Sequence, residues 1–272
     1  MSTLQPGRIR EEFESVRLPL WLEAFFGLEW LALHASPVYW GRGVPRSDGA
    51  PVITIPGFLG FDRYLVEMHY WLRRLGYRPY FSAIGYNAEC PEVLTRRLFR
   101  TMNRAHRETG QKVHLIGHSL GGILARGAAV RRPDQVAQVI SLASPFRAIR
   151  AHPAVLSAAR FVRGRILGRP RRRFRLREDC YTAKCTCAFL DSLKEEIPPS
   201  VGRAAIFTKS DGIVDWRSCI EDDARLNIEV HASHVGLAFN REAYEKIAVL
   251  LASPQPDLPQ AQDQRPAGIP IS

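Results

Sequence analysis

The sequence is poor in acidic residues, in cysteine and in long apolar runs. It has 27 Asp and Glu against 38 Lys and Arg, a net charge of +11 that would suit anionic partners. No recognised DNA- or RNA-binding motif accompanies this charge, so no nucleic-acid partner is expected. Residues 1–17 are charged and lack the apolar stretch of a signal peptide, which predicts a cytoplasmic protein. A position at the periphery of a membrane is the alternative.

The five cysteines are an odd number without a secretory context, which predicts reduced thiols. Cys180, Cys185 and Cys187 form a C-x4-C-x-C cluster, a spacing that is not typical of zinc sites. We interpret these three residues as buried thiols or as containing one disulfide. No metal and no organic cofactor is expected.

Strand-like and helix-like segments alternate along the chain of 272 residues, of which 46% are hydrophobic. The apolar, partly β-branched runs expected to be strands are 51–55, 78–84, 112–117, 136–143, 203–209 and 226–232. The segments expected to be helices are 61–75, 91–110, 119–131 and 240–252. This alternation predicts an α/β fold with one doubly wound, mostly parallel sheet of about six strands, within residues 46–252.

The N-terminal segment, residues 1–45, stands outside this pattern. Its stretch LPLWLEAFFGLEWLAL (18–33) is strongly apolar, but Glu23, Gly27 and Glu29 interrupt it. It is too short and too charged for a transmembrane helix. We predict an apolar helical segment packed on the core, and the alternatives are a membrane-associated anchor or a wall of an acyl-binding site.

Two further segments interrupt the alternation. Residues 145–200 lie between two expected strands, which predicts an inserted helical cap. Residues 253–272 are rich in Pro and Gln and poor in large apolar residues, which predicts a disordered tail.

The stretch from Gly117 to Gly121, GHSLG, has the G-x-S-x-G pattern of a nucleophile elbow. That turn needs a strand before it and a helix after it, and the expected elements at 112–117 and 119–131 supply both. Glycines at the flanking positions let the backbone turn sharply without a Cβ clash. Ser119 is therefore the candidate nucleophile.

A serine hydroxyl needs a general base, and that base needs a carboxylate to set its tautomer. Of the histidines after Ser119, His152 comes too early and His231 lies at a strand. His234 follows the last expected strand, in a loop that should reach the carboxyl edge of the sheet. We therefore favour His234 over His231 as the base.

The candidate acid is Asp211, which follows the strand that ends near Lys209. Asp215 lies four residues further on, where it could instead cap the turn that begins at Trp216. A tetrahedral intermediate also needs two backbone donors. The N–H of Leu120, which follows the nucleophile, and the N–H of Phe58, in the glycine-containing loop after 51–55, are the candidates.

Four segments in this order resemble those of bacterial lipases and esterases of the α/β-hydrolase superfamily: IPGFLG, LIGHSLGG, TKSDGIVDW and SHVGLAFN. They span residues 51 to about 250. The SDGIV and SHVGL segments resemble the acid turn and the histidine turn of small bacterial lipases. The resemblance implies a triad of Ser119, Asp211 and His234. Pro56 is a departure, because many lipases have histidine before the oxyanion glycine.

The expected function is that of a carboxylic ester hydrolase that forms an acyl-enzyme on Ser119. The alternatives are a thioesterase or acyltransferase that uses the same triad, and a non-catalytic binding protein that keeps the fold. The substrate is expected to be a small-molecule or lipid ester. Neighbours of the motifs that could line the substrate site are Leu59, Tyr86, Asn87, Phe146, Val235 and Leu237.

Residues 160–177 contain nine arginines and no acidic residue, so they account for most of the surplus positive charge. If 153–167 is helical, Phe161, Val162, Ile166 and Leu167 have the spacing of an apolar stripe. A basic amphipathic segment suits an anionic lipid surface. This segment is a candidate for peripheral membrane contact, and a solvated arm is the alternative.

Overall fold

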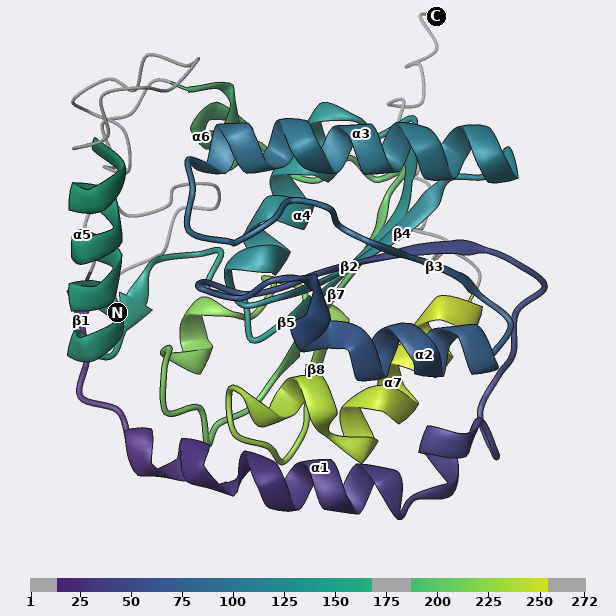
Figure 1. The fold of residues 1–272 in the computed structure, drawn as a ribbon, viewed down its shortest axis with the longest axis horizontal. Coiled ribbons are helices and arrows are strands. Elements are labelled where there is room, and N and C mark those ends of the chain that lie inside the picture. The colour runs from purple at the N-terminus through teal and green to yellow at the C-terminus, as the bar shows by residue number, and fades with distance from the viewer. Residues whose placement is uncertain (1–13, 168–186, 254–272) are drawn as a thin grey trace, which may run out of the picture.

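The computed structural model describes residues 14–167 and 187–253, and its centre is one parallel sheet of six strands (Figure 1). The order of the strands in the sheet is β3-β2-β4-β5-β7-β8. Their bounds are Pro51–Ile55 (β2), Arg78–Phe81 (β3), Val113–His118 (β4), Val136–Leu142 (β5), Gly202–Phe207 (β7) and Asn227–Glu229 (β8). The α/β fold class predicted from the sequence is confirmed.

The central strands are buried on both faces, as parallel strands covered by helices must be. All five residues of β2 are buried, and β4 and β5 each have one residue that is not. Ile55 of β2 lies beside Gly117 of β4. Because every strand runs in the same direction, the loops that follow β2, β4, β7 and β8 all leave the sheet at one edge.

Helices cover both faces of the sheet, so the sheet is doubly wound (Figure 1). One layer contains α3 (Pro91–Thr109), α4 (Leu120–Arg131) and the short α6 (Ala188–Ser192). The other contains α2 (Val66–Arg74), α7 (Arg241–Ala252) and α1 (Phe26–His34). The helix ends follow local sequence signals. Pro91 opens α3, Gly110 ends it with a φ of 69°, and the Asn240 side chain accepts hydrogen bonds from the first turn of α7.

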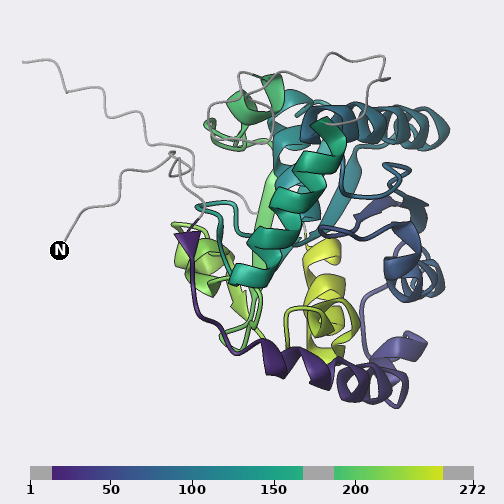
Figure 2. The ribbon, with the colours of Figure 1, turned by 60° about the vertical axis from the view of Figure 1, so that its left-hand side comes forward.

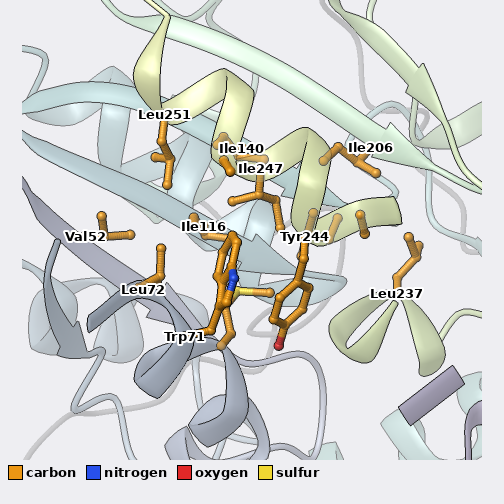
Figure 3. Close-up of a cluster of buried hydrophobic side chains, with 14 of the residues drawn as sticks. Val52, Trp71, Leu72, Ile116, Ile140, Ile206, Leu237, Tyr244, Ile247 and Leu251 are labelled. Carbon is orange, nitrogen blue, oxygen red and sulfur yellow. The ribbon is translucent and has the colours of Figure 1, made fainter. Parts of the chain in front are cut away.

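The core beneath α2 and α7 is a cluster of large apolar side chains (Figure 3). Leu33 of α1 also belongs to this cluster. Leu237 belongs to this cluster and is fully buried, together with Trp71 and Tyr244. The sequence placed Leu237 among the substrate-site candidates, and that expectation is corrected. Its side chain points from the turn η6 (Gly236–Phe239) into the core.

The segment between β5 and β7 begins with β6 (Arg150–Ala151), which pairs in parallel with β1 (Glu14–Ser15). The helix α5 follows over Pro153–Leu167, the range on which the apolar-stripe argument depended. Residues 168–186, which include most of the arginine-rich segment, and 254–272, which include nearly all of the expected tail, lie outside the described residues. On the far side of that gap, Phe189 of α6 packs against Gly127 of α4.

Within the described ranges, no helix combines the length and the apolar character needed to cross a bilayer. The apolar N-terminal stretch divides instead into the 3-10 helix η1 (Leu20–Phe25), α1 and the 3-10 helix η2 (Pro37–Trp40). Figures 1 and 2 show these elements along one edge of the molecule, beside α7 and η6.

We expect Leu237→Ala to lower the free energy of unfolding by about 2–5 kcal/mol, because the substitution leaves a cavity in a buried cluster. Leu31→Ala, at a side chain that is 57% exposed, is the matched control and should change stability by less than about 0.5 kcal/mol. Urea denaturation of both variants measures the difference. A Leu237→Ala protein as stable as the control would place this side chain outside the core.

Candidate active site

Ser119 lies in the sharp turn between β4 and α4, in a backbone conformation that few residues with a side chain adopt. Its φ is 52° and its ψ is −122°. Such a conformation is strained by about 1–3 kcal/mol and persists only where the surroundings enforce it. The N–H of Ser119 donates to the carbonyl of Leu142 in β5, and its carbonyl accepts from Gly122. The strand, turn and helix of a nucleophile elbow are therefore all present.

Close packing explains the glycines around Ser119. A Cβ atom on Gly117 would lie 2.4 Å from the backbone of Gly122. One on Gly121 would lie 2.2 Å from the carbonyl oxygen of Ile55, and one on Gly122 would lie 2.0 Å from the Ser144 hydroxyl. Each approach is shorter than any non-bonded contact of a real side chain, so the turn can form only with glycine at these positions.

His234 follows β8 and is buried, and its Nδ1 lies 2.7 Å from Oδ2 of Asp211. The other carboxylate oxygen of Asp211 accepts from the N–H groups of Ile213 and Val214 at 2.8 and 2.7 Å, which fixes the carboxylate. With Nδ1–H donating to Asp211, the Nε2 of His234 is left as a proton acceptor. The structure thus brings these two candidate residues together across the ends of two neighbouring strands.

The pKa of His234 is raised above its ordinary value by its surroundings. Burial alone would lower the pKa, but the charge of Asp211, its hydrogen bond and the charge of Glu23 together outweigh burial. Ser119 lies next to His118, whose ring centroid is 4.9 Å from that of His234. Within the described residues no hydrogen bond joins the Ser119 hydroxyl to His234. Such bonds often tighten only when substrate binds.

The alternative acid and base have other roles. The Asp215 side chain caps the 3-10 helix η4 (Trp216–Ser218) by accepting from the N–H of Arg217, and it pairs with Arg150 at 2.9 Å. This is the capping role that the sequence offered for Asp215. The His231 side chain is almost fully exposed and faces Glu242.

His118 is a buried histidine that the sequence analysis passed over. Burial and the nearby His234 lower the pKa of His118 to about 3, so its ring is neutral near neutral pH. Its Nε2 lies 2.9 Å from the carbonyl oxygen of His234, so Nε2 carries the proton and donates. The elbow and the histidine loop are thereby joined directly. Its position between Gly117 and Ser119 was the only signal of this role in the sequence.

The loop after β2 runs against the elbow. A Cβ on Gly57 would lie 3.1 Å from the Cβ of Ser119, so the loop approaches the nucleophile closely. Asn87 is fully buried and holds this loop. Its side-chain Nδ2 donates to the backbone carbonyl of Pro56 at 2.7 Å, and its backbone carbonyl accepts from the N–H of Leu59 at 3.0 Å. The expected contact between the Asn87 side chain and substrate is therefore corrected to a role in bracing the loop that contains Phe58.

The other expected substrate contacts differ in accessibility. Leu59, within the loop that Asn87 braces, and Tyr86, next to Asn87 in the sequence, are both exposed. Phe146 is partly buried beneath the Arg126 guanidinium, which lies 3.7 Å from its ring centroid. Val235 is half-buried, and its backbone carbonyl accepts from the Tyr64 hydroxyl at 3.1 Å.

Glu23, from the N-terminal segment, binds both loops of the candidate acid and base. Its Oε1 accepts from the N–H groups of Gly212 and His234 at 2.9 and 3.0 Å, and its Oε2 accepts from Val235 at 2.8 Å. Hydrogen bonds to a charged group each contribute about 1.5–3 kcal/mol. The residue that interrupted an apolar run in the sequence is thus an anchor for the loops on either side of the Asp211–His234 pair.

Glu29, six residues further on in α1, makes a second contact of the same kind. It accepts from the Ser233 N–H at 2.8 Å and from the Asn240 side chain at 3.3 Å. Glycines make room for both carboxylates. A Cβ on Gly212 would lie 2.9 Å from Glu23, and one on Gly236 would lie 2.3 Å from Glu29. These are the glycines of the SDGIV and SHVGL segments.

Within the described residues, Cys90, Cys187 and Cys219 form no disulfide, while Cys180 and Cys185 lie outside the described part of the chain. Burial and the charges of Asp211 and Asp215 raise the pKa of the Cys219 thiol, which disfavours its reactive thiolate. Among the described residues, no cluster of histidine, cysteine and carboxylate side chains could hold a metal ion.

The fold is that of the α/β-hydrolases. A Listeria innocua structure aligns with a TM-score of 0.52 and 18% identity over 77% of this chain and 96% of its own. A Bacillus licheniformis lipase structure aligns with a TM-score of 0.50 and 14% identity over 77% and 94%. The fold class predicted from the motifs is thus shown by solved structures as well as by the sheet itself.

Within this class, the sequence is similar to bacterial lipases. A triacylglycerol lipase of Burkholderia plantarii is 29% identical over 130 residues, 44% of this chain and 36% of the lipase. One of Pseudomonas fragi is 32% identical over 105 residues, 35% of this chain and 34% of the lipase. The palmitoyl protein thioesterase family model matches residues 89–193. The chain thus matches about a third of the length of these curated relatives, and the predicted resemblance to lipases and esterases is confirmed.

We expect Glu23→Gln to lower the pKa of His234, because the substitution removes a negative charge that stabilises the imidazolium. Histidine NMR titration measures this shift. Glu29→Gln is the matched control: it loosens the same loop, but Glu29 does not contribute to the pKa of His234, which should change little. An equal fall in both variants would mean that loop displacement, and not the charge of Glu23, sets the pKa.

Proposed function

We propose that the protein is a serine hydrolase that cleaves carboxylic esters, with Ser119 as nucleophile, His234 as base and Asp211 as the orienting acid. The observation that carries the proposal is the strained Ser119 turn at the same sheet edge as a buried Asp211–His234 pair, joined to it through His118. The similarity to triacylglycerol lipases supports an ester substrate of small-molecule or lipid type.

In the proposed reaction, the Ser119 oxygen attacks the ester carbonyl carbon while Nε2 of His234 takes the hydroxyl proton. The tetrahedral intermediate collapses with cleavage of the bond to the alcohol oxygen, and the alcohol leaves with the proton from His234. A water molecule activated by His234 then attacks the acyl-enzyme, which releases the acid and restores Ser119. No step requires a metal or an organic cofactor.

The oxyanion of the intermediate needs donors that are already in place. Leu120 is the first residue of α4, so its N–H has no partner within the helix and carries the positive end of the helix dipole. Phe58 follows Gly57, which approaches Ser119 closely. We assign the N–H groups of Leu120 and Phe58 as the oxyanion hole, with Asn87 bracing the loop of the second donor.

Thioester hydrolysis is the second candidate function, because the palmitoyl protein thioesterase family model matches residues 89–193. The same nucleophile and oxyanion hole can act on a thioester carbonyl. Parallel assays with p-nitrophenyl esters and acyl thioesters of equal chain length distinguish the two. Transfer of the acyl group to an added alcohol would indicate an acyltransferase.

The peripheral membrane contact expected through residues 160–177 remains a proposal. Residues 168–177 lie outside the described part of the chain, and Arg160 and Arg165 of α5 are exposed. These exposed arginines support contact between α5 and an anionic surface.

We expect Ser119→Ala to reduce turnover by about a factor of 10⁶ without loss of folding, because triad members act as a unit. A fluorophosphonate probe should label the wild type at Ser119 and leave this variant unlabelled. Ser210→Ala, at an exposed serine beside Asp211, is the control and should remain active and labelled. A wild-type protein that the probe does not label, and that cleaves neither ester nor thioester, would favour the non-catalytic binding protein.

We expect Asp211→Asn to lower kcat by about 10⁴-fold with little change in KM, because His234 loses the partner that sets its tautomer. Asp215→Asn should lower kcat much less, because Asp215 caps η4. A larger loss of kcat in Asp215→Asn than in Asp211→Asn would reverse the assignment of the acid.

A pH profile of the wild type adds a second test. The value of kcat/KM should fall as the pH falls through a pKa above the ordinary histidine value, since protonated His234 cannot act as base.

A further inference from the structure

The N-terminal segment turns its carboxylates inward and its large apolar side chains outward. Glu23 and Glu29 bind the loops near His234, whereas Leu33 is the only residue of α1 that is buried. Eight large side chains of this segment are between 38% and 67% exposed: Leu20, Trp21, Phe25, Phe26, Leu28, Trp30, Leu31 and Trp40. We call these eight residues the N-terminal apolar face.

This arrangement is the reverse of that in an ordinary surface helix, which packs its apolar side on the core. The eight residues lie within 21 consecutive positions, from Leu20 to Trp40, and along one edge of the molecule (Figures 1 and 2). Single exposed apolar residues are common, but a group of this kind marks a surface that binds something. The inward carboxylates hold the segment in place, so the apolar residues remain outside.

The charges around the face indicate the chemistry of what it binds. Glu23 and Glu29 are the only acidic residues between Arg17 and Arg46, and both are engaged with backbone N–H groups. The exposed charged side chains in this range are therefore arginines: Arg17, Arg42 and Arg46. Arginines thus flank the face on both sides in the sequence, and positive charge next to Trp, Phe and Leu suits an anionic lipid headgroup region.

We propose that the N-terminal apolar face binds the surface of an anionic lipid bilayer or lipid aggregate. Trp and Phe insert at the level of the headgroups, where amphipathic aromatic rings are favoured, and arginines contact the lipid phosphates. The surface differs from the arginine-rich segment 160–177, because it lies more than 100 residues earlier in the chain and depends on apolar contact as well as on charge.

The position of the face relates it to the candidate active site. Residues of η1 and α1 carry apolar side chains outward and, through Glu23 and Glu29, contact the backbone of residues 233–235 inward. Binding of the face would bring the His234 loop close to a lipid surface. The relevance of this position to catalysis rests on the proposed ester hydrolysis. The binding itself does not depend on catalysis.

The test compares two double variants by co-sedimentation with vesicles of phosphatidylcholine, alone or mixed in equal parts with phosphatidylglycerol. Trp21→Ser with Leu31→Ser removes two residues of the face, which are 67% and 57% exposed. Tyr70→Ser with Val249→Ser removes two residues elsewhere, which are 53% and 49% exposed. We expect wild type and the second variant to bind the mixed vesicles equally, and the first variant to bind them at least about tenfold more weakly.

Trp fluorescence gives a direct readout, since insertion of Trp21 into the headgroup region should shift its emission to shorter wavelengths. Arg17→Ser with Arg42→Ser should weaken binding to mixed vesicles and reduce its dependence on salt. All variants should hydrolyse a small soluble ester, or take up the fluorophosphonate probe, as wild type does. A failed hydrolase assignment would therefore leave the binding result interpretable.

Three outcomes would overturn the proposal. The first is equal vesicle binding by wild type and the Trp21→Ser, Leu31→Ser variant. The second is a wild-type protein that binds no vesicles but forms a dimer that this variant loses, which would identify a second copy as the occupant. The third is a wild-type protein that is monomeric and binds no vesicles, which would mean that the face has no lipid partner.

Discussion

The carboxylate of Glu23 is the interaction on which the geometry of the site depends. It accepts hydrogen bonds from Gly212, next to Asp211, and from His234 and Val235, so one side chain fixes two loops that follow different strands. The Asp211–His234 contact needs both loops in register, and a short hydrogen bond tolerates little displacement. The same charge favours protonated His234, so Glu23 acts on position and on electrostatics at once.

The second constraint is steric and acts on Ser119, the candidate nucleophile. The strained turn at Ser119 is held by contacts that only glycine permits, with Gly121 lying against the carbonyl of Ile55 in the neighbouring strand. The turn and the loop after β2 therefore cannot move independently. Asn87 fixes the other side of that loop, and His118 joins the elbow to the His234 backbone. The four loops at this edge thus form one connected structure around Ser119.

The sequence predicted the features that local patterns encode. Alternating apolar runs defined the parallel sheet, and the glycine spacing around Ser119 identified the elbow. The position after a strand singled out Asp211 and His234, which the structure brings to 2.7 Å. The order of the strands and the inward contacts of Glu23 and Glu29 could not be predicted. A glutamate in an apolar run looks the same whether it faces solvent or a set of N–H groups more than 180 residues away.

Leu237 and Asn87 illustrate why proximity to a motif in sequence is a weak guide to contact with substrate. In the turn η6, successive residues point in different directions, so Leu237 enters the core although Val235, two positions earlier, lies at the loop surface. Asn87 was expected at the edge of the site. Its buried amide, however, is used by the backbone of a neighbouring loop, and such pairing is set by tertiary structure alone.

The contact between Glu23 and Val235 joins residues that are 212 positions apart. Closing such a loop is entropically costly until the chain between has become compact, so we expect this contact to form after the sheet and its helices. The N-terminal segment precedes β7 and β8 in the chain, but Glu23 can bind the loops that follow these strands only once the strands have paired. The sheet and the Ser119 turn can therefore form before Glu23 anchors the loop that contains His234. The Asp211–His234 pair would then reach its final position in a later step than the sheet.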